Sequence, residues 1–220
     1  MIGWLLAAVG MYMLMAKWIR PWIYDVMIVD MTRVWYQTVI NLLDRNVHLL
    51  DVGIGTGTAL LLNKSVLKAK NIKVTGIDYD KDYVELCDKN IKKESMSKNV
   101  GVSLMSVYDY NPDHKFDAAY FSGSLMIMPD PVGALKQVKK MLKDNGLIYI
   151  TQTIETNKSP MLELTKPLLK FITTIDFGNV TYQNDFESSI QQAGLKIKRC
   201  ISLGTSKMTT SRSFKLFVVQ

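Results

Sequence analysis

Glycines at every second position, directly after an apolar segment, constrain the fold of this chain more than any other feature. Residues 49–57 read Leu-Leu-Asp-Val-Gly-Ile-Gly-Thr-Gly. Glycine has no Cβ atom, so such a loop can turn sharply and bring its backbone close to a nucleotide-like ligand. A second apolar segment, 72–77, leads into Asp78 about 20 residues beyond the loop, where a carboxylate can accept hydrogen bonds from both hydroxyls of a ribose. The sequence therefore predicts a strand, a ligand-binding loop and a second strand.

The rest of the chain continues this alternation of strands and helices. Strands are predicted at 48–52, 72–77, 102–107, 116–121 and 147–153, with helices at 58–67, 82–95 and 131–143. Such alternation is typical of an α/β fold with a mostly parallel sheet and helices on both faces. Beyond residue 153 we predict helices at 160–173 and 182–193, then a closing hairpin of strands at 195–203 and 213–219. No linker or repeat divides this part, so 46–220 is expected to form one domain.

The beginning of the chain is strongly apolar. Residues 1–16 contain no charged side chain, and Lys17 and Arg20 follow. We expect 1–20 to form a hydrophobic helix that anchors the protein in a membrane as a single pass; a helix lying in the membrane plane or buried in protein, and a targeting segment, are the alternatives. Because the basic residues follow the apolar run, the domain should face the cytoplasm or the mitochondrial matrix. Apolar positions at helical spacing predict an amphipathic helix over 21–45, packed on the domain or lying on the membrane surface.

Charge and cysteine content exclude several classes of partner. The net charge is +7, but the lysines are scattered and not interleaved with aromatic residues, so we expect a solvated surface and no nucleic-acid partner. Cys87 and Cys200 form no CxxC pair, which indicates neither a disulfide framework nor a metal site. The two histidines, His48 and His114, lie outside the region where a substrate is expected.

Residues 51–57 closely match the first motif of the class I S-adenosylmethionine-dependent methyltransferases, acidic-x-Gly-x-Gly-x-Gly, and the chain resembles that family from about residue 49 to its end. The resemblance implies a Rossmann-like seven-stranded sheet in which the antiparallel last strand lies between the fifth and sixth. It also implies S-adenosylmethionine as the cofactor and S-adenosylhomocysteine as the product. In the family, the opening acid and the loop hold the methionine end of the cofactor, which here implies Asp51, Gly53, Gly55, Thr56 and Gly57.

The resemblance extends to the other end of the cofactor. The family's acid at the end of strand two holds the ribose, which implies Asp78 with its neighbour Tyr79. An acid just after strand three faces the adenine amino group and matches Asp109, with Tyr108 beside the ring. The end of strand four, at Ser122, resembles the segment that faces the methyl group.

The acceptor side is less informative. Open α/β sheets bind ligands at the carboxyl ends of their strands, so Ser122, Ser124, Gln152 and Thr153 are candidates to line the acceptor pocket. None is a strong base, and methyl transfer depends mainly on placement, so no catalytic residue is assigned. Apolar residues at 125–128 and 161–171 could face the same pocket. Together with the helix at 21–45, they favour a small lipid-like or membrane-soluble methyl acceptor, with membrane lipid as a partner.

Three other functions are compatible with parts of this pattern. An accessory subunit of a larger membrane complex could keep the fold without activity. A nicotinamide-binding domain would share the first glycines, but Thr58 stands where its motif needs glycine, and the closing hairpin has no place in it. A soluble nucleic-acid methyltransferase is suggested by the positive charge alone, and the apolar N-terminal segment argues against it.

Overall fold

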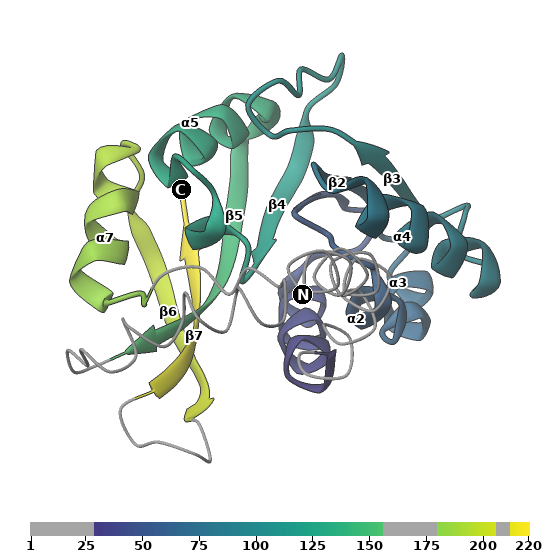
Figure 1. Ribbon diagram of the computed structural model, residues 1–220, viewed down its shortest axis with the longest axis horizontal. Helices are drawn as coiled ribbons and strands as arrows, with labels where there is room; N and C mark the ends of the chain where they lie inside the picture. Colours follow the sequence, from purple (N-terminus) through teal and green to yellow (C-terminus); the bar gives the residue numbers. More distant parts are fainter. Residues whose placement is uncertain (1–28, 156–179, 206–211) are drawn as a thin grey trace, which may run out of the picture.

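Seven strands form one sheet in the computed structural model, which describes residues 29–155, 180–205 and 212–220 (Figure 1). The strands are β1 (His48–Val52), β2 (Lys73–Asp78), β3 (Val100–Leu104), β4 (Phe116–Ser122), β5 (Leu142–Glu155), β6 (Ile197–Thr205) and β7 (Arg212–Val219). Their order is β3-β2-β1-β4-β5-β7-β6. β1 to β5 pair in parallel, and β7 lies antiparallel between β5 and β6. This confirms the predicted Rossmann-like sheet with its antiparallel last strand.

The described helices are α2 (Thr58–Leu61), α3 (Lys64–Ala69), α4 (Lys81–Lys93), α5 (Pro131–Met141) and α7 (Gln183–Gln192), with a short 3-10 turn η1 (Leu125–Ile127). Two of them, α4 and α5, begin at an aspartate that caps the first turn. At the start of α4 the Asp80 side chain accepts hydrogen bonds from backbone N–H groups of the first turn. Asp130 does the same for α5, where Pro131 occupies the first turn. Residues 29–42 are also helical and are called the N-terminal helix below.

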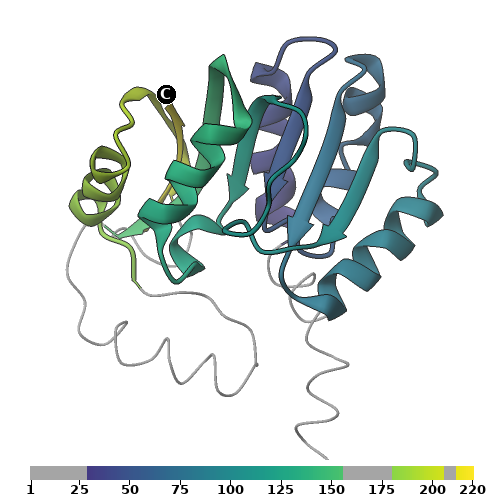
Figure 2. The same cartoon turned by 90° about the horizontal axis from the view of Figure 1, so that it is seen from above.

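Two apolar cores lie on opposite faces of the sheet, because successive side chains of a strand point to opposite sides. Ala119 and Phe121 of β4 belong to the core beneath α5 and α7, here called the α5 face. Ala118 and Tyr120 belong to the core beneath the N-terminal helix and α2 to α4, here called the N-helix face. Figure 2 shows α5 and α7 on one side of the sheet and the N-terminal helix on the other. The prediction of helices on both faces is therefore confirmed.

Several predicted boundaries were wrong. The helix predicted at 58–67 is divided into α2 and α3, because Asn63 at the break donates from its side chain to the carbonyls of Ala59 and Arg33. β3 ends at Leu104, and the chain turns where the backbone N–H groups of Asp109 and Tyr110 bond to Ser106. The helix predicted to reach 143 ends at 141, and β5 begins directly after it, with a register shift against β4.

Three predicted helices lie wholly or partly outside the described residues. Those predicted at 1–20 and 160–173 lie wholly outside them. The amphipathic helix predicted over 21–45 is described from residue 29, and it is helical to residue 42. It packs on the domain through residues at helical spacing, namely Thr32, Trp35, Tyr36, Val39, Ile40 and Leu43. Within 29–155, 180–205 and 212–220, no helix has both the length and the apolar character needed to cross a membrane.

Candidate cofactor site

The loop after β1 adopts a conformation that requires its glycines. Gly53, Gly55 and Gly57 have φ angles of 76°, 60° and 69°, in the left-handed region that side chains other than glycine rarely adopt. Space is restricted as well, because a Cβ atom on Gly53 would lie 2.6 Å from the Cβ of Ser124. A Cβ atom on Gly57 would lie 2.6 Å from Sγ of Cys87 in α4. We call residues 53–57 the glycine loop, and both constraints explain why the sequence alternates as it does.

Asp51, the first acid of the motif, is completely buried near the end of β1. Its Oδ2 accepts a hydrogen bond of 2.8 Å from the hydroxyl of Tyr36, while Oδ1 has no partner among the described residues. Burial raises the pKa of Asp51 to about 7, against the effect of the Tyr36 hydrogen bond and with a contribution from Asp78. A buried carboxylate oxygen without a partner is costly unless a donor or a cation meets it. The ammonium group at the methionine end of S-adenosylmethionine fits this requirement.

Asp78, at the end of β2, joins the second strand to the glycine loop. Its Oδ2 accepts from the backbone N–H of Gly55 at 2.9 Å, and its Oδ1 accepts from the backbone N–H of Asp80 at 3.0 Å. Burial raises the pKa of this carboxyl group too, while the backbone hydrogen bonds act in the opposite direction. The neighbouring Tyr79 is 76% exposed. The structure thus brings Asp51, the glycine loop and Asp78 together at the carboxyl ends of β1 and β2, as the sequence indicated.

The residues predicted to surround the adenine lie in the turn after β3. The Tyr108 hydroxyl donates to the backbone carbonyl of Asp130 at 2.9 Å and accepts from its N–H at 3.0 Å, which ties the turn to the start of α5. Asp109 is exposed. Among the described residues, no hydrogen bond links Asp109 to the glycine loop or to Asp78. Its role towards adenine therefore stays a prediction.

A small cavity of about 20 Å³ lies beside the glycine loop, with room for about one water molecule. Its wall comes from the N-terminal helix, the loop with the start of α2, and β4: Val29, Thr32, Tyr36, Gly53, Ile54, Thr56, Gly57, Thr58, Ala59 and Ser122. The hydroxyl oxygen of Ser122 is buried without a partner among the described residues. Thr56, which is 2% exposed, pairs with the Thr58 hydroxyl at 2.9 Å. The N-terminal helix therefore closes over the end of the site that holds Asp51.

The four polar acceptor-side candidates do not converge. Ser122 lies on the N-helix face and lines the cavity, whereas Gln152 lies between Ile150 and Ile154 on the α5 face. Gln152 donates to Thr181 at 3.3 Å, and its Oε1 has no partner in the described part of the chain. Ser124 donates to the carbonyl of Val52 and so braces the loop. Thr153 shares the N-helix face with Ser122 by alternation along the paired strands.

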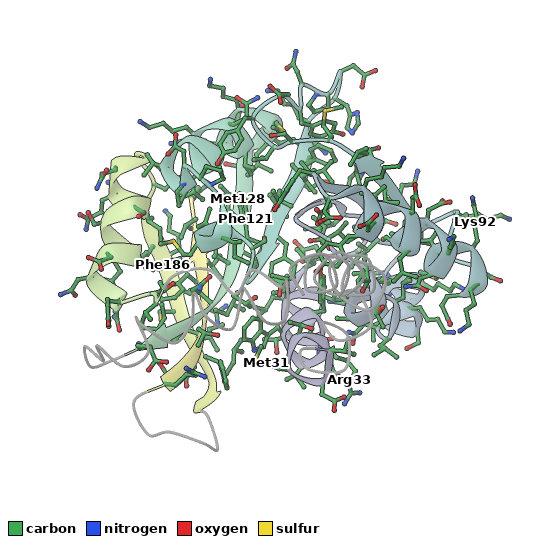
Figure 3. The ribbon with its side chains drawn as sticks, viewed as in Figure 1. Met31, Arg33, Lys92, Phe121, Met128 and Phe186 are labelled. Carbon is green, nitrogen blue, oxygen red and sulfur yellow. The ribbon has the colours of Figure 1, made fainter. Side chains whose placement is uncertain are left out.

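The apolar segment at 125–128, for which the sequence left both core packing and pocket lining open, is not among the residues that line the cavity. Leu125 is fully buried in the core on the α5 face, and Met126 and Met128 pack against that core. Figure 3 shows Met128 beside Phe121, whereas Met31 and Arg33 lie on the N-terminal helix. The sequence pattern could not tell the two faces apart, because a short turn after a strand can point to either. The segment at 161–171 lies outside the described residues.

The two histidines lie away from the site, whereas a tyrosine that the sequence analysis did not single out contacts it. His48 and His114 stack with ring centroids 5.0 Å apart, at the amino ends of β1 and β4 and away from the glycine loop. Tyr36, in contrast, contacts the site and was missed. The one available signal was a hydroxyl group within an otherwise apolar helical stripe formed by Trp35, Tyr36, Val39 and Ile40.

Comparison with known proteins agrees with this geometry. The family model described as "Methyltransferase domain" matches residues 43–194, more than half of the chain. The chain belongs to this methyltransferase family. A probable cobalt-precorrin-6B C(15)-methyltransferase (decarboxylating) of Thermoplasma volcanium is 33% identical over 85 residues, which cover 39% of this chain and 42% of that protein. A phosphatidylethanolamine N-methyltransferase of Cereibacter sphaeroides is 22% identical over 132 residues, or 60% of this chain and 63% of that protein.

A demethylmenaquinone methyltransferase of Lactobacillus johnsonii is 28% identical over 52% of this chain and 47% of its own length. The methyltransferase chain thus spans between about two fifths and two thirds of these curated relatives. Among solved structures, the [4+2]-cyclase SpnF matches with a TM-score of 0.69 at 19% identity, covering 85% of this chain and 79% of that one. A SAM-dependent methyltransferase from Geobacter sulfurreducens, in complex with S-adenosyl-L-homocysteine, matches with a TM-score of 0.62 at 13% identity, covering 86% and 90%. These likenesses show the class I methyltransferase fold.

Proposed function

We propose that this protein is an S-adenosylmethionine-dependent methyltransferase whose cofactor lies across Asp51, the glycine loop and Asp78. The observation that carries the proposal is the buried Asp51, with Oδ1 unpaired in the described structure, beside a loop of three left-handed glycines. When bound, the cofactor supplies a methyl group on a positively charged sulfur. Asp51 provides a carboxylate oxygen for the ammonium group at the methionine end of the cofactor.

The chain's own residues divide the work between binding and positioning. The glycine loop lets the backbone approach the ligand closely, and Asp78 offers carboxylate lone pairs to ribose hydroxyls. The N-terminal helix keeps water away from the methionine end through Val29, Thr32 and Tyr36. Neither histidine lies near this site, so the acceptor has to bring a nucleophile that needs no histidine base. Placement close to the methyl group then supplies most of the acceleration.

For the acceptor we propose a small lipid-like or membrane-soluble molecule, reached by a domain that residues 1–20 hold at a membrane. The uncharged sequence of residues 1–16 supports this. So do the names of three relatives, which are a phosphatidylethanolamine N-methyltransferase, a demethylmenaquinone methyltransferase and a ubiquinone biosynthesis O-methyltransferase. Phe214, which is half-buried and packs on the buried Trp35 with ring centroids 5.8 Å apart, adds apolar surface near the carboxyl end of β5.

The test is acceptor-dependent formation of S-adenosylhomocysteine by the full chain purified in detergent. The protein is incubated with S-adenosylmethionine labelled in its methyl group, together with phosphatidylethanolamine vesicles, a demethylated quinone or a water-soluble catechol. The proposal expects label in a lipid-phase product, and expects the Asp78→Asn variant to lose it. Label only in the catechol would contradict the lipid-like acceptor. No turnover of any acceptor by a protein that binds the cofactor would favour the alternative, an accessory subunit of a membrane complex.

A further inference from the structure

Tyr36 of the N-terminal helix is held at both ends of its side chain. It is 3% exposed, and its hydroxyl donates to Oδ2 of Asp51 at 2.8 Å. Its ring meets the ring of Tyr120 edge-on, with centroids 5.0 Å apart and planes at 88°. The Tyr120 hydroxyl in turn pairs with the Thr151 hydroxyl at 2.9 Å, deep in the sheet. The phenol therefore has little freedom to leave the carboxylate while the helix stays packed.

This contact divides the two oxygens of Asp51 between different tasks. Oδ2 is fixed by Tyr36, and Oδ1 has no partner in the described structure. Tyr36 also lines the cavity together with Gly53 and Ser122. One side chain thus contacts both the acid of the motif and the space beside the glycine loop.

We propose that Tyr36 is a positioning residue of the cofactor site, because its hydroxyl fixes Oδ2 of Asp51 and so presents Oδ1 to the ammonium group of S-adenosylmethionine. The inference rests on the proposed function. The hydrogen bond between Tyr36 and Asp51 also couples two events. Packing of the N-terminal helix on the sheet favours cofactor binding, and cofactor binding favours that packing.

Cofactor binding should then depend on pH through Asp51. The titratable groups that act on or are acted on by Asp51 are Tyr36 from the N-terminal helix, Asp78 from β2 and Cys87 from α4. Burial raises the pKa of Asp51 to about 7, and donation by Tyr36 opposes that rise. The ammonium group of the ligand prefers the ionised carboxylate, so ligand affinity should increase as pH rises through about 7. Without the Tyr36 hydroxyl, the pKa of Asp51 rises further and the increase moves to higher pH.

The experiment measures S-adenosylhomocysteine binding to the full chain in detergent by calorimetry, from about pH 5.5 to about pH 8.5. Wild type is compared with Tyr36→Phe, which keeps the ring against Tyr120, and with Tyr149→Phe, another buried tyrosine of the same core, which does not line the cavity. We expect Tyr36→Phe to bind about tenfold more weakly near pH 7 and to recover at higher pH. Tyr149→Phe should follow the wild-type profile.

Three results would overturn the inference. In the first, Tyr36→Phe binds S-adenosylhomocysteine as tightly as wild type at every pH. In the second, its affinity is lower by the same factor at every pH, and this second result would indicate a purely structural role. If Tyr36→Phe does not fold, Asp51→Asn replaces it and should show affinity independent of pH; a wild-type profile there contradicts the inference. A folded wild type that binds no S-adenosylhomocysteine at any pH instead refutes the proposed function itself, so the two failures are distinguishable.

Discussion

Replacement of Gly57 by alanine tests whether the glycine loop is as constrained as its geometry indicates. Two costs add up at this position. Its φ of 69° is a left-handed conformation, which costs an alanine about 1–2 kcal/mol. The new Cβ atom would also lie 2.6 Å from Sγ of Cys87, and overpacking of this kind costs about 1–3 kcal/mol. We therefore expect Gly57→Ala to lower the free energy of unfolding by about 2–5 kcal/mol, as measured by urea titration.

A second substitution separates the two costs. Cys87→Ala removes the sulfur atom that the new methyl group would strike, but leaves the backbone strain in place. The double variant should therefore be more stable, by about 1–3 kcal/mol, than the two single effects added together predict. Gly101→Ala is the matched control, because no atom lies within 4 Å of a Cβ atom built there and its φ lies outside the left-handed region. Strictly additive effects, or a Gly57→Ala cost below about 0.5 kcal/mol, would refute the reasoning.

Three further predictions concern charge. The pKa of Asp51 is raised from 3.8 to about 7, which means that the folded state disfavours the ionised carboxylate. Asp51→Asn should therefore stabilise the ligand-free protein by a few kcal/mol above about pH 7 in urea titrations. This gain should shrink as pH falls towards about 4. Burial and the neighbouring histidine lower the pKa of His48, so the His48 contribution to thermal stability should fall as pH drops below about 6.5, and the stability of His48→Gln relative to wild type should rise over that range. Glu155 is 3% exposed and ion-paired with Arg212 at 2.6 Å, so Arg212→Met should cost about 3 kcal/mol in urea titrations, whereas Lys92→Met, at an exposed pair, should cost less than about 1 kcal/mol.

Local sequence patterns predicted the part of the site that lies on consecutive elements. The glycine loop and Asp78 follow directly from strands whose apolar runs and ends are visible in the sequence. Parallel pairing of β1 and β2 then places Asp51 opposite Gly76, so that Asp51 and Asp78 both lie near the carboxyl ends of their strands. This part needed no information about distant segments.

The remaining features depend on contacts between distant segments, which no local pattern contains. Tyr36 meets Asp51 only because the N-terminal helix packs across the sheet at one particular rotation. The break between α2 and α3 needs the side chain of Asn63 to reach the carbonyl of Arg33, 30 residues earlier. The turn at 125–128 is apolar whichever face it covers, so the sequence could not decide between the core beneath α5 and the acceptor pocket.

Calorimetric binding of S-adenosylhomocysteine to the full chain in detergent tests the central claim most directly. The comparison includes Asp78→Asn and, as a control, Asp144→Asn. Asp144 is an exposed acid near the amino end of β5, whereas Asp78 lies at the carboxyl end of β2. We predict micromolar binding by wild type and Asp144→Asn, and binding at least about tenfold weaker in a folded Asp78→Asn variant. Equal binding by all three proteins, or no binding by folded wild type, would contradict the assignment of this site to the cofactor.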